Sequence, residues 1–269
     1  MKPGPVEPMI SDLYFYPIKS FRGFKVAEFR LDARGPQFDR RWTLVDEAAK
    51  FLTLRQMPQI ARIGLRFDGD TGLELSTPST EPIDFGLNEV EGPEAQVMVW
   101  KDSVPAREVS AEVSEWLSGV LAKKVRLMRL SDQAVRPFSD KLPERSIGFA
   151  DKQPLLVIGR ESLRELERKA GITIAMSRFR PNIVIDNIAA HAEDTWQGFT
   201  ADGVKFEAVK PCTRCKITQV HPLTGEVSAE PLQTLTTYRK QDNGKINFGF
   251  YFAHTKEGRL KVGAKIVPV

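Results

Sequence analysis

Both cysteines of this chain lie in one short segment, Lys210-Pro-Cys-Thr-Arg-Cys-Lys216, where they are spaced as Cys-x-x-Cys. Basic residues flank and separate them. A thiolate is the nucleophile and the metal ligand, and nearby positive charge favours it over the thiol. This segment is therefore where we expect a sulfur atom to bind a ligand.

A structural zinc site and a thioredoxin-like redox pair both use this spacing. A zinc site requires a second pair of ligands, but the chain has no other cysteine and its three histidines are scattered: His191, His221 and His254. A thioredoxin-like pair lies at the start of a helix in a βαβ unit. Here the residues after Cys215, Lys216–Val220, alternate like a strand. Both interpretations are weak.

A third interpretation is a single soft thiolate that holds a metal or a metal-bearing cofactor, with Thr213 and Arg214 as local donors. The structural alternative is two buried, unreactive cysteines. The flanking charges argue against deep burial of this segment.

The composition is that of an ordinary globular protein. Of the 269 residues, 41% are hydrophobic and 28% are charged, which allows one large domain or two modest ones. The net charge of +4 comes without a long Lys/Arg run. The small basic excess therefore favours a local anion site, and we expect no nucleic-acid partner.

Cysteine content and hydropathy indicate a cytoplasmic protein. Two cysteines cannot form a disulfide framework, which favours a reducing compartment. The N-terminal Met1–Pro8 has no apolar core and is not a signal peptide. No apolar run approaches the ~18 residues that a membrane span needs, so we expect no membrane partner.

Three groups of residues at strand–loop junctions are candidates for anion binding. Lys19 and Ser20 follow a predicted strand, Arg40 precedes another, and Arg180 precedes a third. Cationic and hydroxyl donors in such loops suit an anion such as phosphate. The alternatives are a solvated loop at Lys19 and an ion pair of Arg40 with Asp39.

Short strands with few helices predict a mostly β fold of the α+β class. The hairpin signal between Ala61–Phe67 and Gly72–Ser76 is typical of an antiparallel barrel or sandwich. Ser110 is a candidate helix N-cap, and a helix over Glu161–Ala170 should end at Gly171. The polar, proline-bearing residues 131–146 predict a boundary between two domains, 1–130 and 131–269.

Six motifs in order resemble the MOSC (molybdenum cofactor sulfurase C-terminal) family with its N-terminal β-barrel domain, in particular the amidoxime-reducing components and the bacterial reductases of N-hydroxylated bases. The motifs are Tyr16-Pro-Ile-Lys-Ser20, Asp39-Arg-Arg-Trp42, Phe179-Arg-Pro-Asn182, Lys210-Pro-Cys-Thr-Arg-Cys215, His221-Pro-Leu-Thr-Gly225 and Gly249-Phe-Tyr251. The resemblance implies an N-terminal β-barrel-like domain and a C-terminal MOSC β-barrel domain.

The resemblance also implies a molybdenum-pyranopterin cofactor. By that resemblance Cys215 is the metal ligand and the catalytic residue. Lys152-Gln153 stands where eukaryotic relatives have Thr-Ser, so the resemblance does not define the exact contacts of this loop. The residues implied to bind the pterin and its phosphate are Lys19, Ser20, Arg40, Lys152, Gln153, Arg180, Asn182, Thr213, Arg214 and Tyr251.

The implied activity is the two-electron reduction of the N–O bond of a small N-hydroxylated substrate. Because the chain has no spare cysteines and ends straight after its last predicted strand, we expect a separate electron-donor protein of the flavin, haem or iron–sulfur type. The alternative is a non-catalytic carrier of molybdenum cofactor, or of sulfur as a persulfide on Cys215. A purely structural interpretation has inert cysteines and surface arginines.

Overall fold

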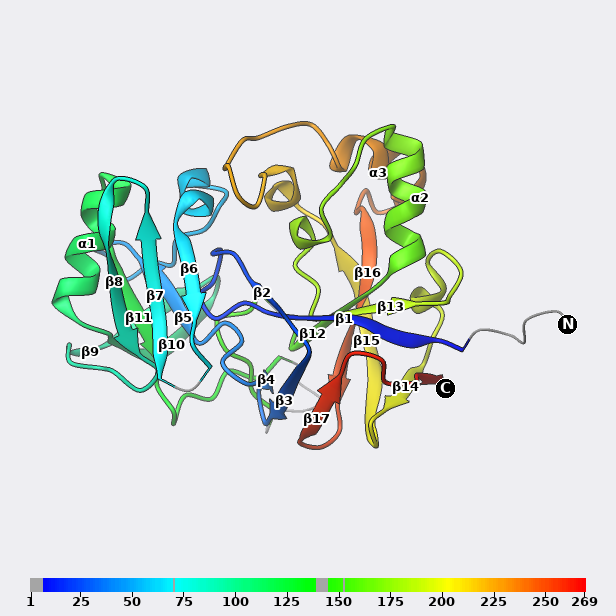
Figure 1. The fold of residues 1–269 in the computed structure, drawn as a ribbon, viewed down its shortest axis with the longest axis horizontal. Coiled ribbons are helices and arrows are strands. Elements are labelled where there is room, and N and C mark those ends of the chain that lie inside the picture. The colour runs from blue at the N-terminus through cyan, green and yellow to red at the C-terminus, as the bar shows by residue number, and fades with distance from the viewer. Residues whose placement is uncertain (1–6, 70, 139–144, 152) are drawn as a thin grey trace, which may run out of the picture.

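The computed structural model describes residues 7–69, 71–138, 145–151 and 153–269 and shows two lobes side by side (Figure 1). One lobe contains β5 to β11 with α1, and the other contains β12 to β16 with α2 and α3. Strands dominate, and the described residues form three α-helices. The predicted mostly β fold with a few helices is confirmed.

The largest sheet has eight strands, in which β12 and β13 run parallel and the other neighbours run antiparallel. Their order is β18 (Val267–Pro268), β14 (Gly198–Ala201), β15 (Val204–Thr213), β16 (Asn247–His254), β12 (Leu155–Gly159), β13 (Ile183–Asp186), β1 (Met9–Phe15) and β2 (Phe24–Val26).

Three smaller sheets complete the described strands. Their orders are β5 (Trp42–Val45), β11 (Arg126–Leu130), β10 (Asp102–Glu108), β9 (Glu94–Val99); β17 (Gly258–Lys261), β3 (Glu28–Asp32), β4 (Gly35–Pro36); and β6 (Gly64–Phe67), β7 (Gly72–Thr77), β8 (Thr80–Gly86). The helices are α1 (Ala111–Leu121), α2 (Arg160–Ala170) and α3 (Leu232–Arg239), with 3-10 turns η1 (Pro58–Arg62), η2 (Met176–Arg178), η3 (Ala192–Asp194) and η4 (Lys216–Gln219).

The predicted helix ends are confirmed. The Ser110 hydroxyl accepts the Val113 N–H at 3.3 Å, which satisfies one free donor of the first turn of α1. Gly171 ends α2 with a φ of 69°, a left-handed conformation that glycine adopts without a Cβ clash. None of the helices in the described parts of the chain is long and apolar enough to cross a bilayer.

The strand β12 is buried on both faces because its alternate side chains pack into two different cores. Leu155 and Val157 join the core that also contains Phe206 and Phe252. Leu156 and Ile158 pack on the other face against the residues of α2 and α3. A strand that is covered on both faces needs apolar side chains at every position, and residues 155–158 form such a continuous apolar run.

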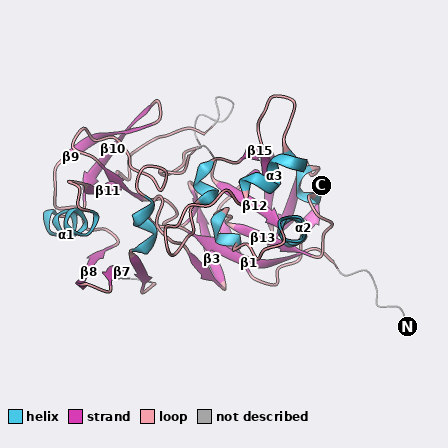
Figure 2. Ribbon diagram, turned by 90° about the horizontal axis from the view of Figure 1, so that it is seen from above, coloured by secondary structure: helices cyan, strands magenta, loops and turns pink. Residues whose placement is uncertain are grey.

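The first strands of the chain belong to sheets of the C-terminal half. β1 pairs with β13 on one side and β2 on the other, and β3 pairs with β17. In the view from above, β1 lies beside β13 (Figure 2). Hydrogen bonds between strands therefore join the two halves of the sequence. The proposed domain limits, 1–130 and 131–269, stay a prediction.

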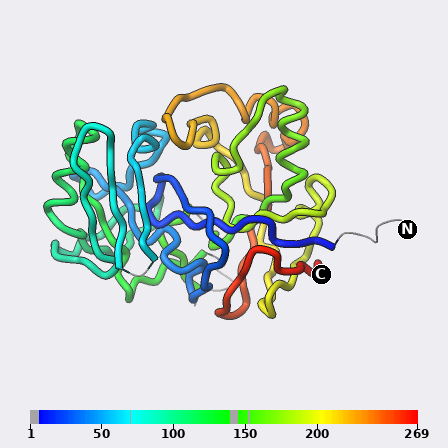
Figure 3. Tube along the Cα trace, viewed as in Figure 1, coloured from blue at the N-terminus to red at the C-terminus, as the bar shows by residue number. Residues whose placement is uncertain are grey.

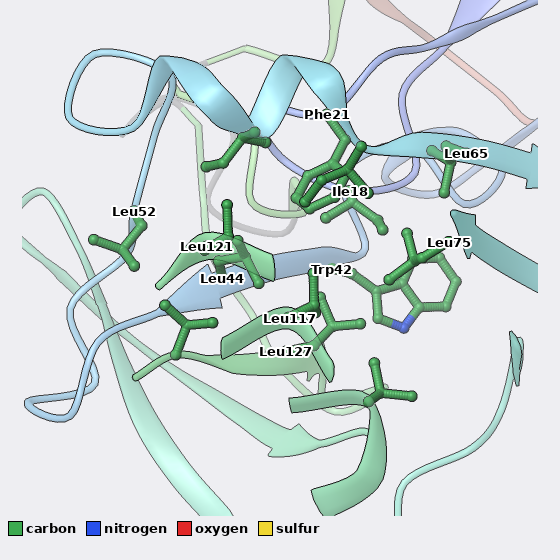
Figure 4. Packing of buried hydrophobic residues seen from close by; sticks show 14 of the residues in the cluster. Ile18, Phe21, Trp42, Leu44, Leu52, Leu65, Leu75, Leu117, Leu121 and Leu127 are labelled. Carbon is green, nitrogen blue, oxygen red and sulfur yellow. The ribbon is translucent and has the colours of Figure 1, made fainter. Parts of the chain in front are cut away.

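The other lobe has its own core around the fully buried Trp42 (Figure 4). Leu117 and Leu121 of α1 and Leu44 of β5 lie in the same cluster. Ile18 also belongs to it, and its neighbour Lys19 donates its backbone N–H to the Trp42 carbonyl at 2.8 Å. The core thereby fixes the loop that follows β1.

A loop from the C-terminal half, residues 216–228, reaches across to η1 of the other lobe (Figure 3). Arg62 Nε donates to the Thr224 carbonyl at 2.8 Å. Gly225 has a φ of 74°, and a Cβ there would lie 2.5 Å from the Pro58 carbonyl, so this close approach requires glycine. The segment that follows Cys215 is therefore held by both lobes.

We expect the protein to lose stability as the pH falls below 6.5. His254 is 8% exposed, its Nε2 lies 2.8 Å from the Asp32 carbonyl, and its buried Nδ1 has no partner. Burial lowers the pKa of His254 from 6.5; the hydrogen bond to the Asp32 carbonyl opposes this effect in part, and the charge of Arg145 adds to it. The unfolded chain therefore binds more protons below pH 6.5, and the free energy of unfolding falls with pH.

Thermal unfolding measured from pH 7.5 to pH 5 checks this expectation. His254→Gln keeps a donor for the Asp32 carbonyl and should flatten the decrease in Tm with falling pH. Part of the decrease should remain, because burial also lowers the pKa of His191. Equal slopes for the wild type and His254→Gln would contradict the expectation.

Candidate functional site

A polar pocket lies where loops from both lobes meet. Its residues come from the segments that follow β1 and β15 and from the segments that precede β5, β12 and β13. Tyr251 of β16 completes the lining. Its lining residues are Lys19, Ser20, Arg40, Ala150, Asp151, Gln153, Leu156, Phe179, Arg180, Asn182, Cys212, Thr213, Arg214, Cys215, Ile217, Thr218 and Tyr251.

Lys19 is buried at one end of this pocket. Its Nζ donates to the Phe149 carbonyl at 2.8 Å and forms an ion pair with Asp151. Burial lowers the pKa of Lys19, and Asp151 only partly opposes this effect. Burial would raise the pKa of Asp151, but Lys19, Arg55 and the Trp100 N–H hold it below its ordinary value. The contact with Lys19 therefore favours the charged form of Asp151.

Arg40 and Arg180 share one aromatic ring. Their guanidinium carbons lie 4.4 Å and 4.3 Å from the centroid of the fully buried Tyr16. Arg40 also pairs with Asp39, the partner expected in the structural alternative. Burial and then the charge of Arg40 lower the pKa of Arg180 to about 10. Two guanidinium groups contact this one ring, and within the described residues only Arg40 of the two has a carboxylate ion pair, which favours a further anion near Arg180.

The backbone of the pocket is strained at three of these residues. Ser20, Arg40 and Arg180 have φ values of 72°, 51° and 56°. Left-handed conformations of non-glycine residues cost about 1–3 kcal/mol each and concentrate at functional sites. The Arg40 N–H donates to the Tyr16 carbonyl at 2.8 Å, and a Cβ at Gly148 would lie 2.5 Å from the Arg40 carbonyl. The surrounding chain thus fixes the unusual backbone.

Asn182 joins the loops from the two halves of the chain. Its Oδ1 accepts the Leu156 N–H at 3.2 Å, and its Nδ2 donates to the Tyr14 carbonyl at 3.2 Å and to Asp39 at 3.3 Å. Arg40 Nη1 also donates to Asn182 Oδ1 at 3.3 Å. This amide therefore holds the backbone that carries Arg180 next to the loop that carries Arg40.

Cys212 lies at the end of β15 and is buried, with 2% of its surface exposed, contrary to the expectation from its charged neighbours. Arg214 explains the burial, because its Nη1 lies 2.8 Å from Cys212 Sγ and its Nη2 donates to the Phe179 carbonyl at 2.8 Å. Tyr251 lines the same pocket as Cys212. Burial, followed by Cys212, raises the pKa of this phenol well above its ordinary value. Tyr251 remains a donor.

Cys215 is exposed and stands directly before η4. The prediction of a strand over Lys216–Val220 is wrong, since residues 216–219 form this 3-10 turn. Thr218 donates its N–H and its hydroxyl to the Cys215 carbonyl, at 3.1 Å and 3.0 Å. Arg178 contacts the carbonyls of Thr218 and Gln219, each at 3.2 Å, and so fixes the turn.

The pocket brings together ten of the residues predicted for the site. They are Lys19, Ser20, Arg40, Gln153, Arg180, Asn182, Thr213, Arg214, Cys215 and Tyr251. Lys152 lies outside the described residues. Asp151, Arg55 and Trp100 were not predicted from the sequence, although an acid next to the predicted Lys152-Gln153 loop was a usable signal for Asp151.

The donor set suits an anionic group attached to one thiolate-bound metal. Within the described residues, no group of three or more His, Cys, Asp or Glu side chains is placed to hold a metal ion. Arg180 Nη2 and Arg214 Nε are buried without a hydrogen-bond partner. Unpaired buried N–H groups are costly unless a ligand accepts from them. The residues present therefore fit a phosphate-bearing cofactor next to Cys215.

Comparison with known proteins agrees with this fold. The MOSC N-terminal beta barrel domain matches residues 7–124, and the MOSC domain matches residues 144–267. The chain belongs to the family of proteins that combine these two domains.

Among its relatives is the mitochondrial amidoxime-reducing component 1 of Mus musculus, 31% identical over 94% of this chain and 80% of that protein. A molybdenum cofactor sulfurase of Drosophila mojavensis is 29% identical over 92% of this chain and 32% of its own length. The solved structure of the YuaD protein from Bacillus subtilis matches 97% of this chain and 94% of that chain, with 8% identity and a TM-score of 0.42.

Proposed function

We propose that this protein binds a molybdenum-pyranopterin cofactor through Cys215 and reduces N-hydroxylated compounds. The observation that carries the proposal is one exposed thiol beside a buried cationic pocket with two unpaired guanidinium N–H groups. The names of the relatives, amidoxime-reducing component and molybdenum cofactor sulfurase, support an association with molybdenum cofactor.

In this proposal the charged residues hold the phosphate and the polar residues orient the pterin. Arg180 and Arg214 offer free N–H groups, and Lys19 and Arg40 add positive charge. A soft thiolate is a suitable ligand for such a metal. The orienting residues are Ser20, Gln153, Asn182, Thr213 and Tyr251.

The proposed reaction removes oxygen from nitrogen. An N-hydroxylated substrate takes up two electrons and two protons, its N–O bond breaks, and the products are the amine or amidine and water. When bound, the cofactor supplies this two-electron chemistry. The chain itself positions the substrate at the exposed side of Cys215 and keeps the phosphate end out of water.

Electrons come from a separate flavin, haem or iron–sulfur protein in this proposal. Iron–sulfur clusters are held by sets of cysteine ligands, and the sequence has two cysteines in all. It also lacks the Gly-x-Gly-x-x-Gly pattern typical of a nicotinamide or flavin dinucleotide site. Both thiols are free, which agrees with the proposed reducing, cytoplasmic location.

A second candidate function is a carrier of molybdenum cofactor or of a persulfide on Cys215. The exposure of Cys215 favours it, since a carrier must present its sulfur to another protein. The same cationic pocket serves either role.

Turnover separates the two functions. The full chain, purified from a host that makes molybdenum cofactor, is mixed with chemically reduced viologen dye and benzamidoxime. We expect many molecules of benzamidine per molybdenum, with two oxidised one-electron dyes for each product. A loaded protein that forms no benzamidine would contradict the reductase and favour the carrier.

A further inference from the structure

Arg55 of the N-terminal lobe lies beside Cys215, Trp100 packs against Arg55, and neither residue has a role in the proposed cofactor site. Arg55 Nη1 lies 3.6 Å from Cys215 Sγ. The Arg55 guanidinium carbon lies 4.7 Å from the centroid of the Trp100 ring. Neither residue lines the pocket that holds the other cations. Together they form a second surface at the same sulfur atom.

The backbone that carries Arg55 is a closed turn. Thr53 donates its N–H and its hydroxyl to Gln56 Oε1, the first at 3.0 Å, and the Gln56 N–H returns to the Thr53 carbonyl at 3.0 Å. Thr53 and Leu54 are buried. The turn thus presents Arg55 toward Cys215 from a fixed base.

Trp100 is held equally firmly, although its side chain is 50% exposed. Its φ of 60° is unusual for an aromatic residue, and its Nε1 donates to Asp151 at 3.2 Å. Its ring centroid lies 5.2 Å from that of Phe51. A strained, exposed tryptophan stacked on the arginine that contacts Cys215 is the kind of feature that concentrates at ligand-binding sites.

The two surfaces of Cys215 differ in access to solvent. Lys19, Ser20 and Asn182, on the cofactor side, are buried. Cys215 and Trp100 are exposed, and Arg55 is partly exposed. A molecule that approaches Cys215 from solvent therefore meets Arg55 and Trp100 first.

The charge of Arg55 is poorly compensated. The charge of Arg55 helps to lower the pKa of Asp151. This carboxylate, however, already forms an ion pair with Lys19 and accepts a hydrogen bond from Trp100. A guanidinium that is stacked on an aromatic ring keeps its N–H edge available for a planar anion. Carboxylates are the preferred partners of such an edge, with two parallel hydrogen bonds.

We propose that Arg55 and Trp100 form the substrate-binding wall beside Cys215 and select flat N-hydroxylated compounds that carry a carboxylate. Arg55 binds the carboxylate, and the edge and exposed surface of Trp100 contact the flat body of the substrate. This inference rests on the proposed reductase function for the identity of the ligand.

The test measures equilibrium binding without an electron donor, so that no turnover occurs. Isothermal titration compares 4-carboxybenzamidoxime with uncharged benzamidoxime on the molybdenum-loaded full chain. We expect the wild type to bind the carboxylated compound about tenfold more tightly, and Arg55→Gln to lose this preference while its Kd for benzamidoxime changes less than about twofold. Trp100→Leu should weaken the binding of both compounds.

Arg66→Gln is the matched control, because it removes one positive charge from an exposed side chain that pairs with Glu74. It should bind both compounds like the wild type, and molybdenum content should be equal in all variants. Loss of molybdenum from Arg55→Gln would overturn the inference, since Arg55 would then hold the cofactor. A carboxylate preference that is absent from the wild type, or kept in Arg55→Gln, would also overturn it.

The two proposals fail in different ways. If the protein reduces benzamidoxime but Arg55→Gln has no effect on binding, the reductase function is supported and the proposed role of Arg55 in substrate binding is contradicted. If the carboxylated compound binds in an Arg55-dependent way but the protein reduces neither compound, the binding site is supported and the reductase function is contradicted.

Discussion

Cys215→Ser protein from a cofactor-competent host should contain less than about a tenth of the molybdenum of the wild type, because a hydroxyl is a poor substitute for a soft thiolate ligand. Cys215 is exposed, and its side chain contacts Arg55 rather than the core. The variant should therefore stay folded, with a Tm within about 2 °C of the wild type. Elemental analysis and thermal unfolding measure the two quantities on one preparation.

Cys212→Ala is the control for this experiment. Cys212 is the other thiol of the Cys-x-x-Cys pair, but it is buried in the core beside Phe179 and Phe248. We expect it to retain molybdenum, with a stability cost from the altered packing. Full molybdenum content in Cys215→Ser would show that Cys215 is not the ligand. Loss of molybdenum in Cys212→Ala alone would show that Cys212 is the ligand instead.

Arg180→Met should weaken retention of the cofactor about 10- to 100-fold, because hydrogen bonds to charged groups are stronger than neutral ones. Arg180 combines an unpaired Nη2 with an Nη1 that donates to the Phe21 carbonyl at 2.6 Å. A bound phosphate would satisfy the first group and offset the burial and the repulsion from Arg40 that together lower the pKa of Arg180 to about 10. Methionine keeps the apolar contact with Tyr16 and removes the charge.

Molybdenum per chain after extensive dialysis measures this loss. Arg168→Met, on the exposed surface of α2, removes the same charge and should change nothing. Arg180→Lys should fall between the wild type and Arg180→Met, because an ammonium supplies charge without a planar pair of donors. If Arg180→Met and Arg168→Met retain equal molybdenum, Arg180 has no part in holding the cofactor.

Residue types and spacing predicted much of the local structure. The helix after Ser110, the end of α2 at Gly171 and the strands that lead into the site are as expected. Anion candidates chosen for charge at strand ends, such as Lys19 and Arg180, do line one pocket. These features depend on local rules, namely capping, periodicity and the position of strand ends.

Long-range contacts explain what the sequence did not predict. The five residues Lys216–Val220 alternate as a strand does, and their 3-10 turn depends on Arg178, a residue of the distant η2. Arg55 stands in an ordinary polar turn, and only the fold places it next to Cys215. A short pattern cannot reveal such neighbours.

The position of β1 in the large sheet also sets the order in which this protein can fold during synthesis. Ser11 Oγ donates to the Val184 carbonyl, a partner 173 residues further along the chain. The ribosome therefore releases β1 long before β13 exists, and closing so large a loop is slow. Until then the buried side chains of β1, including Ile10 and Leu13, are without their final partners. The nascent chain therefore has an exposed apolar strand for chaperones to bind.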